Sequence, residues 1–586
     1  MKFREKVSNI WGYHIARFIL LVTACIATYI HATDWTIFVY MAADNGLHSS
    51  AIADIVEMQK GLNTSGSKPK IIAYIDHIQT YKGGVVEYLQ ITPSNSSEVS
   101  SRILRTYPDE NSGSGETLTK FLKWAARHSS EKNMLILWSH SNGWQRNTIS
   151  DDEIAPPSRW ICNDWTAEDM IGVSTGELQD AIAKSNTVYD IIMLDACHAG
   201  SIEFVSELNG FADYIIATPD YVPVEGSAWT QILEHWEDSD DATQIAQNIM
   251  THTMNAYDLG GVYNVYGTQP RPVAMSVYDM KHYDAVFHAV KDFADNFANP
   301  EYADFFTNIK DSTPTYTDVH FEIDLMSFAQ TTLDRQADTQ YLVSALEDFI
   351  IYTRALNSAH EKTISIWFPD LFERFIVIYR RYYHNLQFEK TGWGRFLNYV
   401  WGEDTLPPNP VEQVEYVINL DTIYINWKKP IDPCPIEYTV TFYDSNRNVI
   451  KQIDTGENTD AQYKIPHEIY ETEQTFYFSI CAIDEAGNIS IPYENQFTKP
   501  LIENDKFYVA PNPVRGNETK IHYFITRPKN VVFSIYDVTG QMVYQKNEDI
   551  QAGEGVFYIQ NLQSGVYYAI MLAENTALRE KFAVIR

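Results

Sequence analysis

Residues 190–208 read DIIMLDACHAGSIEFVSEL, and this stretch decides the fold of the chain. Its first part, 190–197, is short, apolar and continuous rather than alternating, which is typical of a strand buried on both faces. Its second part, 199–208, has a helical pattern. A buried strand that leads directly into a helix predicts one half of a βαβ unit.

The same alternation continues on both sides of this stretch. Further strand-like runs lie at 35–43, 70–76, 133–140 and 213–218, and helix-like runs lie at 46–60, 115–128 and 175–185. The pattern predicts an α/β domain with a mainly parallel sheet flanked by helices. In such sheets the functional residues gather at the carboxyl ends of the strands.

A thiol and an imidazole stand at two of these strand ends. His140 ends the run 133–140, and Cys197 ends the run 190–197, 57 residues later. A Cys–His pair is the minimum for thiol nucleophilic catalysis, because the imidazole takes the thiol proton and the thiolate attacks a carbonyl. His198 is a rival base, but a sequence neighbour in an extended strand points to the opposite face. We therefore predict His140 and Cys197 as the catalytic residues.

The flanks of these residues also suit acyl transfer. Backbone N–H groups of Ser141 and Cys197 are candidates for an oxyanion hole. The helix expected at 199–208 would direct its positive N-terminal end toward Cys197 and lower the pKa of the thiol.

The composition excludes several classes of protein. The chain has 586 residues, 45% of them apolar, and a net charge of −33. A protein with this much negative charge repels the phosphate groups of nucleic acids. We therefore expect no nucleic-acid partner. The cysteines are too few for a disulfide scaffold and too scattered for a zinc cluster, and no metal site is predicted: Cys25, Cys162, Cys197, Cys434 and Cys481.

The N-terminus is predicted to be a secretory signal peptide over residues 1–32. Basic residues precede an apolar run at 18–30, which is too short for a membrane span of ~20 residues, and small Ala32 offers a cleavage point. An anchor helix and lipidation at Cys25 are the alternatives. No other apolar run reaches a spanning length, so we expect no membrane span in the mature chain.

The chain changes character after residue 400. Pro407-Pro408-Asn409-Pro410 forms a linker, and turn signals then recur about every ten residues without helical patterns. We expect an α/β domain at 33–405 and two all-β sandwich domains at 411–497 and 505–586.

Several ordered motifs give residues 33–400 a resemblance to clostripain-like cysteine peptidases, which have a caspase-like fold. The matching segments are 35–47 with its Asp44-Asn45 turn, 135–144, 190–208 with Glu203, 321–329, 363–369 and 393–396. The resemblance implies a cysteine endopeptidase that uses His140 and Cys197 and needs no cofactor. Relatives usually have glycine where this chain has Ser141.

The resemblance also implies cleavage after arginine or lysine. The acidic residues of the pocket for that side chain fall on Asp195 and Asp220, with Glu225 in reserve. A buried carboxylate at the floor of a pocket favours a basic side chain on physical grounds as well.

Some relatives cleave themselves in the loop after the catalytic histidine. Here that loop, 145–165, offers Arg146 and Arg159 as autocleavage sites. Some relatives also bind calcium; the loop is acidic, but it has no EF-hand spacing.

The β domains resemble two further families. Residues 411–497 resemble a fibronectin type III module, with Trp427 in its core and Cys434 and Cys481 as a candidate disulfide. Residues 507–586, which open with VAPNP at 509–513, resemble the C-terminal sorting domain of type IX secretion substrates. That resemblance implies type IX machinery as a partner and export through the periplasm of a Bacteroidetes-type bacterium to the surface or the medium.

A second function class stays open, a catalytically inactive relative that acts as a surface adhesin. The presence of both His140 and Cys197 favours the peptidase. Turnover of arginine or lysine peptides that a thiol alkylator abolishes would discriminate the two.

Overall fold

The computed structural model describes residues 34–586 except 82, 143–159, 317–318, 336, 359–362, 402–406, 420, 467–468, 471–474, 499–504 and 575. The predicted signal peptide therefore lies outside the described residues. The chain divides into two compact units, residues 1–405 with 431–434, and residues 406–430 with 435–586.

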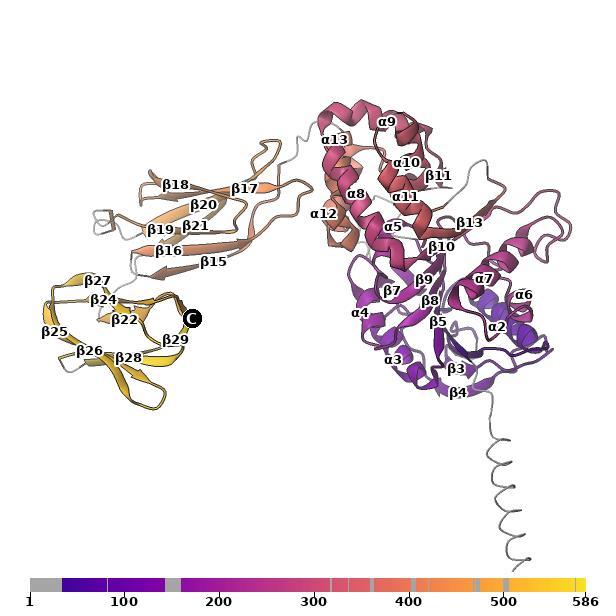
Figure 1. The fold of residues 1–586 in the computed structure, drawn as a ribbon, viewed down its shortest axis with the longest axis horizontal. Coiled ribbons are helices and arrows are strands. Elements are labelled where there is room, and N and C mark those ends of the chain that lie inside the picture. The colour runs from indigo at the N-terminus through magenta and orange to yellow at the C-terminus, as the bar shows by residue number, and fades with distance from the viewer. Residues whose placement is uncertain are drawn as a thin grey trace, which may run out of the picture. The chain divides into compact units, whose positions relative to one another are not determined.

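A nine-stranded sheet forms the centre of the first unit (Figure 1). In spatial order its strands are β13 (Ile350–Leu356), β10 (Val273–Asp279), β9 (Ala212–Ala217), β8 (Tyr189–Asp195), β5 (Lys132–Trp138), β1 (Trp35–Met41), β2 (Lys70–Asp76), β3 (Val86–Gln90) and β4 (Arg102–Tyr107). The five strands from β9 to β2 are parallel, as predicted. The two strands at each edge are antiparallel, which the sequence did not predict.

The middle of each parallel strand is apolar because helices cover both faces of the sheet. In β1, Phe38 and Tyr40 join one buried cluster, while Ile37, Val39 and Met41 join the cluster on the other face. Successive side chains of a strand point to opposite faces, so apolar residues fill both sets of positions in the middle of a strand that is covered on both sides.

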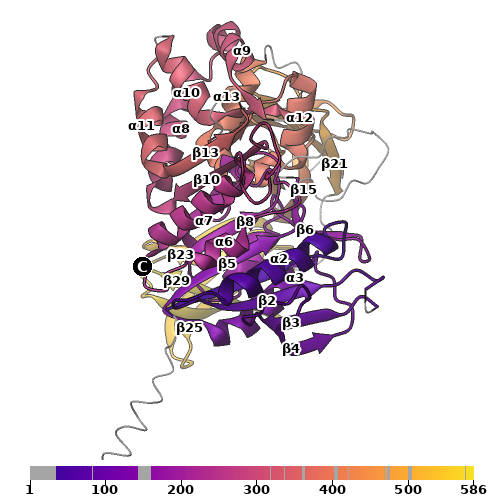
Figure 2. The ribbon, with the colours of Figure 1, turned by 90° about the vertical axis from the view of Figure 1, so that its right-hand side faces the viewer.

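The helices divide between the two faces. Helices α2 (His48–Leu62), α6 (Trp229–Glu234) and α7 (Ala242–Tyr257) cover one face, onto which Figure 2 looks. Helices α3 (Gly115–Ala125), α4 (Glu177–Ala183) and α8 (Tyr283–Phe297) cover the other. Ser114 caps α3 by accepting a hydrogen bond from the Glu116 amide, and Asp241 closes a capping box at the start of α7.

A helical layer rich in aromatic side chains extends the second face. It contains α9 (Ala303–Ser312), α10 (Leu325–Asp334), α11 (Gln340–Phe349), α12 (Phe372–Arg381) and α13 (Trp393–Val400). The rings of Phe293, Phe306 and Phe396 meet edge to face at centroid distances of 5.0–5.4 Å. Strand β14 (Ser365–Trp367) joins this layer to the central domain, because the Trp367 amide donates to buried Glu203 at 2.8 Å.

The second unit begins with a seven-stranded β-sandwich. One sheet contains β15 (Glu412–Asn419), β16 (Thr422–Lys428) and β19 (Asp460–Lys464); the other contains β18 (Val449–Gly456), β17 (Ile436–Tyr443), β20 (Thr475–Asp484) and β21 (Tyr493–Thr498). Trp427 is buried in the core beside Tyr438, as predicted. The candidate disulfide is wrong, since Cys434 and Cys481 are both free thiols.

A further pair of sheets ends the chain. One contains β22 (Lys506–Val509), β24 (Glu518–Ile525) and β27 (Gly553–Gln560); the other contains β23 (Val514–Arg515), β29 (Thr576–Ile585), β28 (Gly565–Ala573), β25 (Lys529–Asp537) and β26 (Met542–Ile550). The side chain of Asn512 donates to the Lys581 carbonyl and accepts from the Ala583 amide, each at 3.0 Å. These bonds join the opening motif of the domain to its last strand.

Candidate active site

The structure brings His140 and Cys197 to the ends of neighbouring strands. Strands β5 and β8 pair in parallel, and the last paired residues are Trp138 and Asp195. His140 and Cys197 each follow two positions beyond that pair. Adjacent strands lie about 4.8 Å apart, so this register holds imidazole and thiol on one edge of the sheet.

Two other segments enclose the imidazole. Its Nε2 lies 3.9 Å from the position that a Cβ would take on Gly46, and the ring of Trp165 lies 3.2 Å from the same point. The backbone carbonyl of His140 accepts a hydrogen bond from the Cys162 amide at 3.1 Å. Burial lowers the pKa of His140, so the neutral imidazole, which is able to take a proton, prevails at neutral pH.

Asn45 fixes the backbone around this histidine. Its side-chain amide donates to the carbonyls of Ala42 and Asn163 at 2.8 and 3.0 Å. Its oxygen accepts from the Leu47 amide at 2.9 Å, and Ser139, the residue before His140, donates to Ala42 at 2.7 Å. The Asp44-Asn45 turn that the sequence singled out thus ties the ends of β1 and β5 together.

The thiol of Cys197 is half-buried and keeps its proton. Burial raises its pKa, and the negative charges of Asp195 and Asp220 raise it further, while a hydrogen bond with the Val222 backbone lowers it. We expected a helix at 199–208 that would lower this pKa. That expectation is wrong, because α5 (Ile202–Ser206) has only five residues and burial of the thiol, with a smaller contribution from the acidic neighbours, raises the pKa.

The turn after Cys197 directs His198 away from the strand. His198 has a left-handed φ of 54°, and its amide donates to the Asp220 carbonyl at 2.9 Å. Its ring packs edge to face on Tyr221, with centroids 4.5 Å apart. The next turn leaves no room for a side chain at Gly200, since a Cβ there would lie 2.6 Å from the Pro219 nitrogen.

Two carboxyl groups meet beside the thiol, and we call them the acidic floor: Asp195, which the sequence predicted, and Asp54 of α2, which it missed. Oxygens of both lie within 4 Å of the position of a Cβ on Gly226. Burial raises the pKa of Asp195 to about 6, although hydrogen bonds from Ser227 oppose that shift. A carboxylate among the apolar residues of an amphipathic helix was the signal that could have revealed Asp54.

The other two acidic candidates differ in their partners. Asp220 is buried, and its Oδ1 accepts the amide of Tyr221 at 2.9 Å; its charge acts on Cys197. Glu225 forms a bidentate ion pair with Arg271 at 2.7 and 2.9 Å. Arg271 lowers the pKa of Glu225, so this reserve candidate is already neutralised.

The remaining predicted residues are the oxyanion-hole candidate Ser141 and the two candidate autocleavage sites. Ser141 is buried and its hydroxyl donates to the Trp160 carbonyl at 3.0 Å. Arg146 and Arg159 lie outside the described residues. Within the described part of the chain, no group of three or more His, Cys, Asp or Glu side chains is placed to hold a metal ion.

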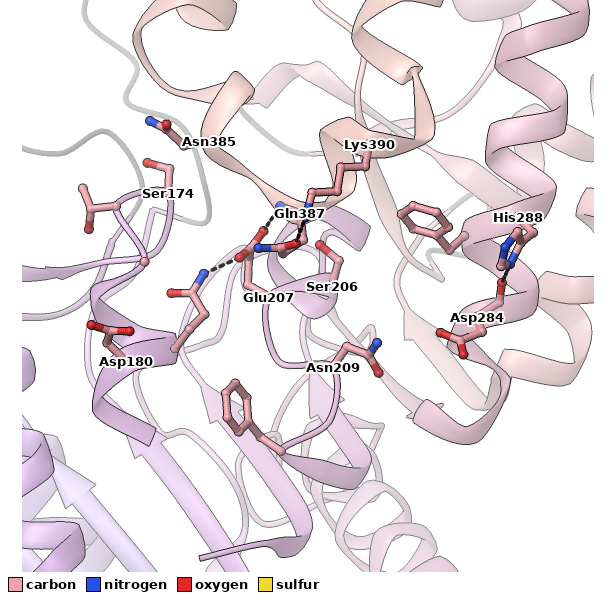
Figure 3. Close-up of a pocket in the computed structure, with 15 residues that line it drawn as sticks. Ser174, Asp180, Ser206, Glu207, Asn209, Asp284, His288, Asn385, Gln387 and Lys390 are labelled. Carbon is pink, nitrogen blue, oxygen red and sulfur yellow. Dashed lines mark hydrogen bonds between the residues drawn. The ribbon is translucent and has the colours of Figure 1, made fainter. Parts of the chain in front are cut away.

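A hollow of about 990 Å³ lies elsewhere in the first unit (Figure 3). Residues of α4, α8 and the 3₁₀ turn Gln387–Thr391 line it, and Glu207 at its base accepts hydrogen bonds from Gln179 and the Gln387 amide. None of the predicted catalytic residues lines this hollow.

An α/β sheet with a thiol and an imidazole at adjacent strand ends, followed by β-sandwiches, defines a caspase-like chain with accessory modules. The sequence model of the clostripain family matches residues 39–401, and the chain belongs to that family. The clostripain of Hathewaya histolytica is 25% identical over 303 residues, which are 45% of this chain and 56% of that protein. The chain thus spans only about half the length of this relative.

Two solved structures are among those to which the chain is similar. A secreted C11 cysteine protease from Bacteroides thetaiotaomicron, bound to an irreversible peptide inhibitor, is 19% identical with a TM-score of 0.47 and covers 62% of this chain and 99% of its own. An inactive zymogen C11 protease from Parabacteroides distasonis is 18% identical with a TM-score of 0.47 and covers 61% and 98%. These likenesses carry no assignment of site residues.

The end of the chain matches a second family model. Residues 508–585 match the secretion system C-terminal sorting domain, which marks an exported protein. Among the described residues, no helix is both long enough and apolar enough to cross a lipid bilayer.

Proposed function

We propose that this protein is an exported cysteine endopeptidase that cleaves after arginine or lysine with a Cys197–His140 dyad. The β5–β8 register carries the proposal, since it aligns the two residues on adjacent strands. Family membership supports the reaction class.

The reaction begins with both groups neutral, because burial lowers the pKa of His140 and raises that of Cys197. His140 takes the thiol proton as sulfur attacks the scissile carbonyl, and it then returns the proton to the leaving amine. Backbone N–H groups of Ser141 and Cys197 stabilise the oxyanion, and water, activated by His140, hydrolyses the acyl-enzyme. None of these steps needs a metal ion.

The side chain before the scissile bond enters beside Asp195, with Asp220 near the thiol. A buried carboxylate favours a guanidinium or ammonium over a neutral side chain. The pairing of Glu225 with Arg271 leaves Asp195 as the better anchor.

Turnover of fluorogenic peptides that end in Arg, Lys, Ala or Asp tests the function. We expect cleavage of the basic peptides only, loss of activity on alkylation, and loss in Cys197→Ala and His140→Ala. Cys162→Ala is the matched control, since Cys162 is fully buried, and it should keep its activity. A wild type without alkylator-sensitive turnover would support the adhesin instead.

We further propose that the enzyme processes itself at Arg146 or Arg159 and is exported by a type IX pathway across the periplasm. Mass spectrometry of the wild type and of Cys197→Ala tests processing, and identical chains in both would refute it. Removal of residues 505–586 should retain the protein inside the cell, in line with the sorting-domain match.

A further inference from the structure

We propose that Asp54 is a specificity-determining residue, which supplies a second carboxyl to the pocket of Asp195 and selects arginine over lysine. This inference rests on the proposed function and deepens it. Asp54 lies on α2, 141 residues before Asp195 in the chain.

Asp54 is built into the floor from a separate element. Only 2% of the residue is exposed, and its Oδ2 accepts a hydrogen bond from the Trp138 indole at 2.8 Å. Trp138 is also the cross-strand neighbour of Asp195 in the β5–β8 register. The same indole that fixes Asp54 therefore stands beside Asp195.

Gly226 shows that the two carboxyls converge. A Cβ on Gly226 would lie 3.3 Å from Oδ2 of Asp54 and 3.7 Å from Oδ2 of Asp195. Gly226 has a left-handed φ of 61°, and its carbonyl accepts a hydrogen bond from Tyr257 at 2.7 Å. Glycine thus brings the pocket loop close to both acids without a side chain between them.

Among the residues that the structure describes, the floor has two acids and no cation of its own. Within the described part of the chain, neither Asp54 nor Asp195 forms an ion pair, and Oδ2 of Asp195 has no hydrogen-bond partner. The nearby cation, Arg271, is bound to Glu225, and Tyr263 donates to Glu57, the acid one turn along α2. Burial and the charge of Asp195 raise the pKa of Asp54 well above its usual range.

A guanidinium compensates two neighbouring acids better than an ammonium does. Uncompensated acids in a dry site are costly, and a cation that hydrogen-bonds both removes the cost. Arginine carries five donors in a planar fork, so it reaches two carboxyls at once, whereas lysine is a point charge. Two acids on different elements therefore favour arginine.

Kinetics of Asp54→Asn on peptides that end in arginine, lysine or citrulline test the inference. Citrulline keeps the shape of arginine without its charge, and Asn keeps an acceptor for Trp138. We expect kcat/KM for arginine to fall about 10- to 150-fold, the range of one charge-assisted hydrogen bond, mainly through KM. Citrulline turnover and the rate of Cys197 alkylation should not change.

Two further variants make the result decisive. Asp238→Asn, a buried acid that instead accepts the Asp34 amide, should leave the arginine-to-citrulline ratio unchanged. Asp54→Glu, whose longer side chain shortens the pocket, should raise the ratio of kcat/KM for lysine peptides to that for arginine peptides. If Asp54→Asn does not fold, this variant tests the role of Asp54 by itself.

The outcomes separate this inference from the proposed function. A wild type that prefers arginine to citrulline, with an equal preference in both Asp54 variants, overturns only the role of Asp54. An equal loss for arginine and citrulline in Asp54→Asn, with no change of ratio in Asp54→Glu, also overturns it, since the residue then serves the fold alone. A wild type without a preference for basic residues overturns both proposals.

Discussion

Replacement of Asp195 by asparagine should stabilise the protein at neutral pH while it removes activity on basic substrates. The pKa of this carboxyl is raised from 3.8 to about 6 by burial, and the residue is 5% exposed. The folded chain therefore holds the proton more tightly than the unfolded chain. Stability from this proton is complete below pH 4 and is lost as the pH rises through 6. A shift of about two pH units corresponds to about 3 kcal/mol.

Urea unfolding of Cys197→Ala, with and without Asp195→Asn, measures this effect without self-digestion. We expect the gain from Asn at pH 7.5 to exceed that at pH 4 by about 2.4 kcal/mol, because the unfolded carboxyl is already partly ionised at pH 4. Asp324→Asn is the contrasting control, because Asp324 accepts bonds from Ser327, Tyr316 and Thr363 at 2.7–2.9 Å, and its substitution should destabilise the fold. Equal effects of Asp195→Asn at the two pH values would refute the reasoning.

Four further results are expected. Arg271→Met, which frees Glu225, should lower KM for arginine peptides up to about 5-fold with kcat unchanged, because an unpaired carboxylate attracts the basic side chain and a partly exposed ion pair contributes roughly 1 kcal/mol; an unchanged KM would contradict this. Alkylation of the unfolded chain without reductant should label both Cys434 and Cys481, and a cross-linked peptide in the mass spectrum would show the opposite. EDTA should leave peptidase activity intact, because the dyad needs no metal; activity that calcium alone restores would disprove this. Arginine amide should speed the alkylation of Cys197 at pH 7, because a bound cation offsets the negative charges that raise the pKa of the thiol. An alkylation rate that arginine amide leaves unchanged would contradict this.

The centre of the fold could be predicted because its strands are buried on both faces. Strands such as β5 and β8 read as continuous apolar runs, which a single sequence reveals. The antiparallel edges could not be predicted in the same way. Strand β4, RILRTY, has exposed positions along most of its length, so its pairing depends on neighbours and not on its own pattern.

The residues of the candidate site also divide into those that the sequence could predict and those that it could not. His140 and Cys197 could be found because each ends a run that the sequence marks as a strand. Asp54 and the Arg271–Glu225 pair could not, because they reach the site through the packing of a helix and a loop. The direction of the pKa shift of Cys197 was mispredicted, because only the helix was considered, whereas burial of the thiol and, to a smaller extent, the nearby acids raise the pKa.

The same negative charges serve recognition and reactivity in opposite ways. In the proposed pocket Asp195 and Asp220 would attract a basic side chain, yet in the empty site their charges add to the burial that raises the pKa of Cys197. A cation bound at the acidic floor offsets these charges, so the thiolate becomes easier to form when a basic substrate is in place. A neutral side chain leaves the opposing charges unchanged. Selectivity in the proposed reaction therefore arises in the chemical step as well as in binding, and Asp195 contributes to both.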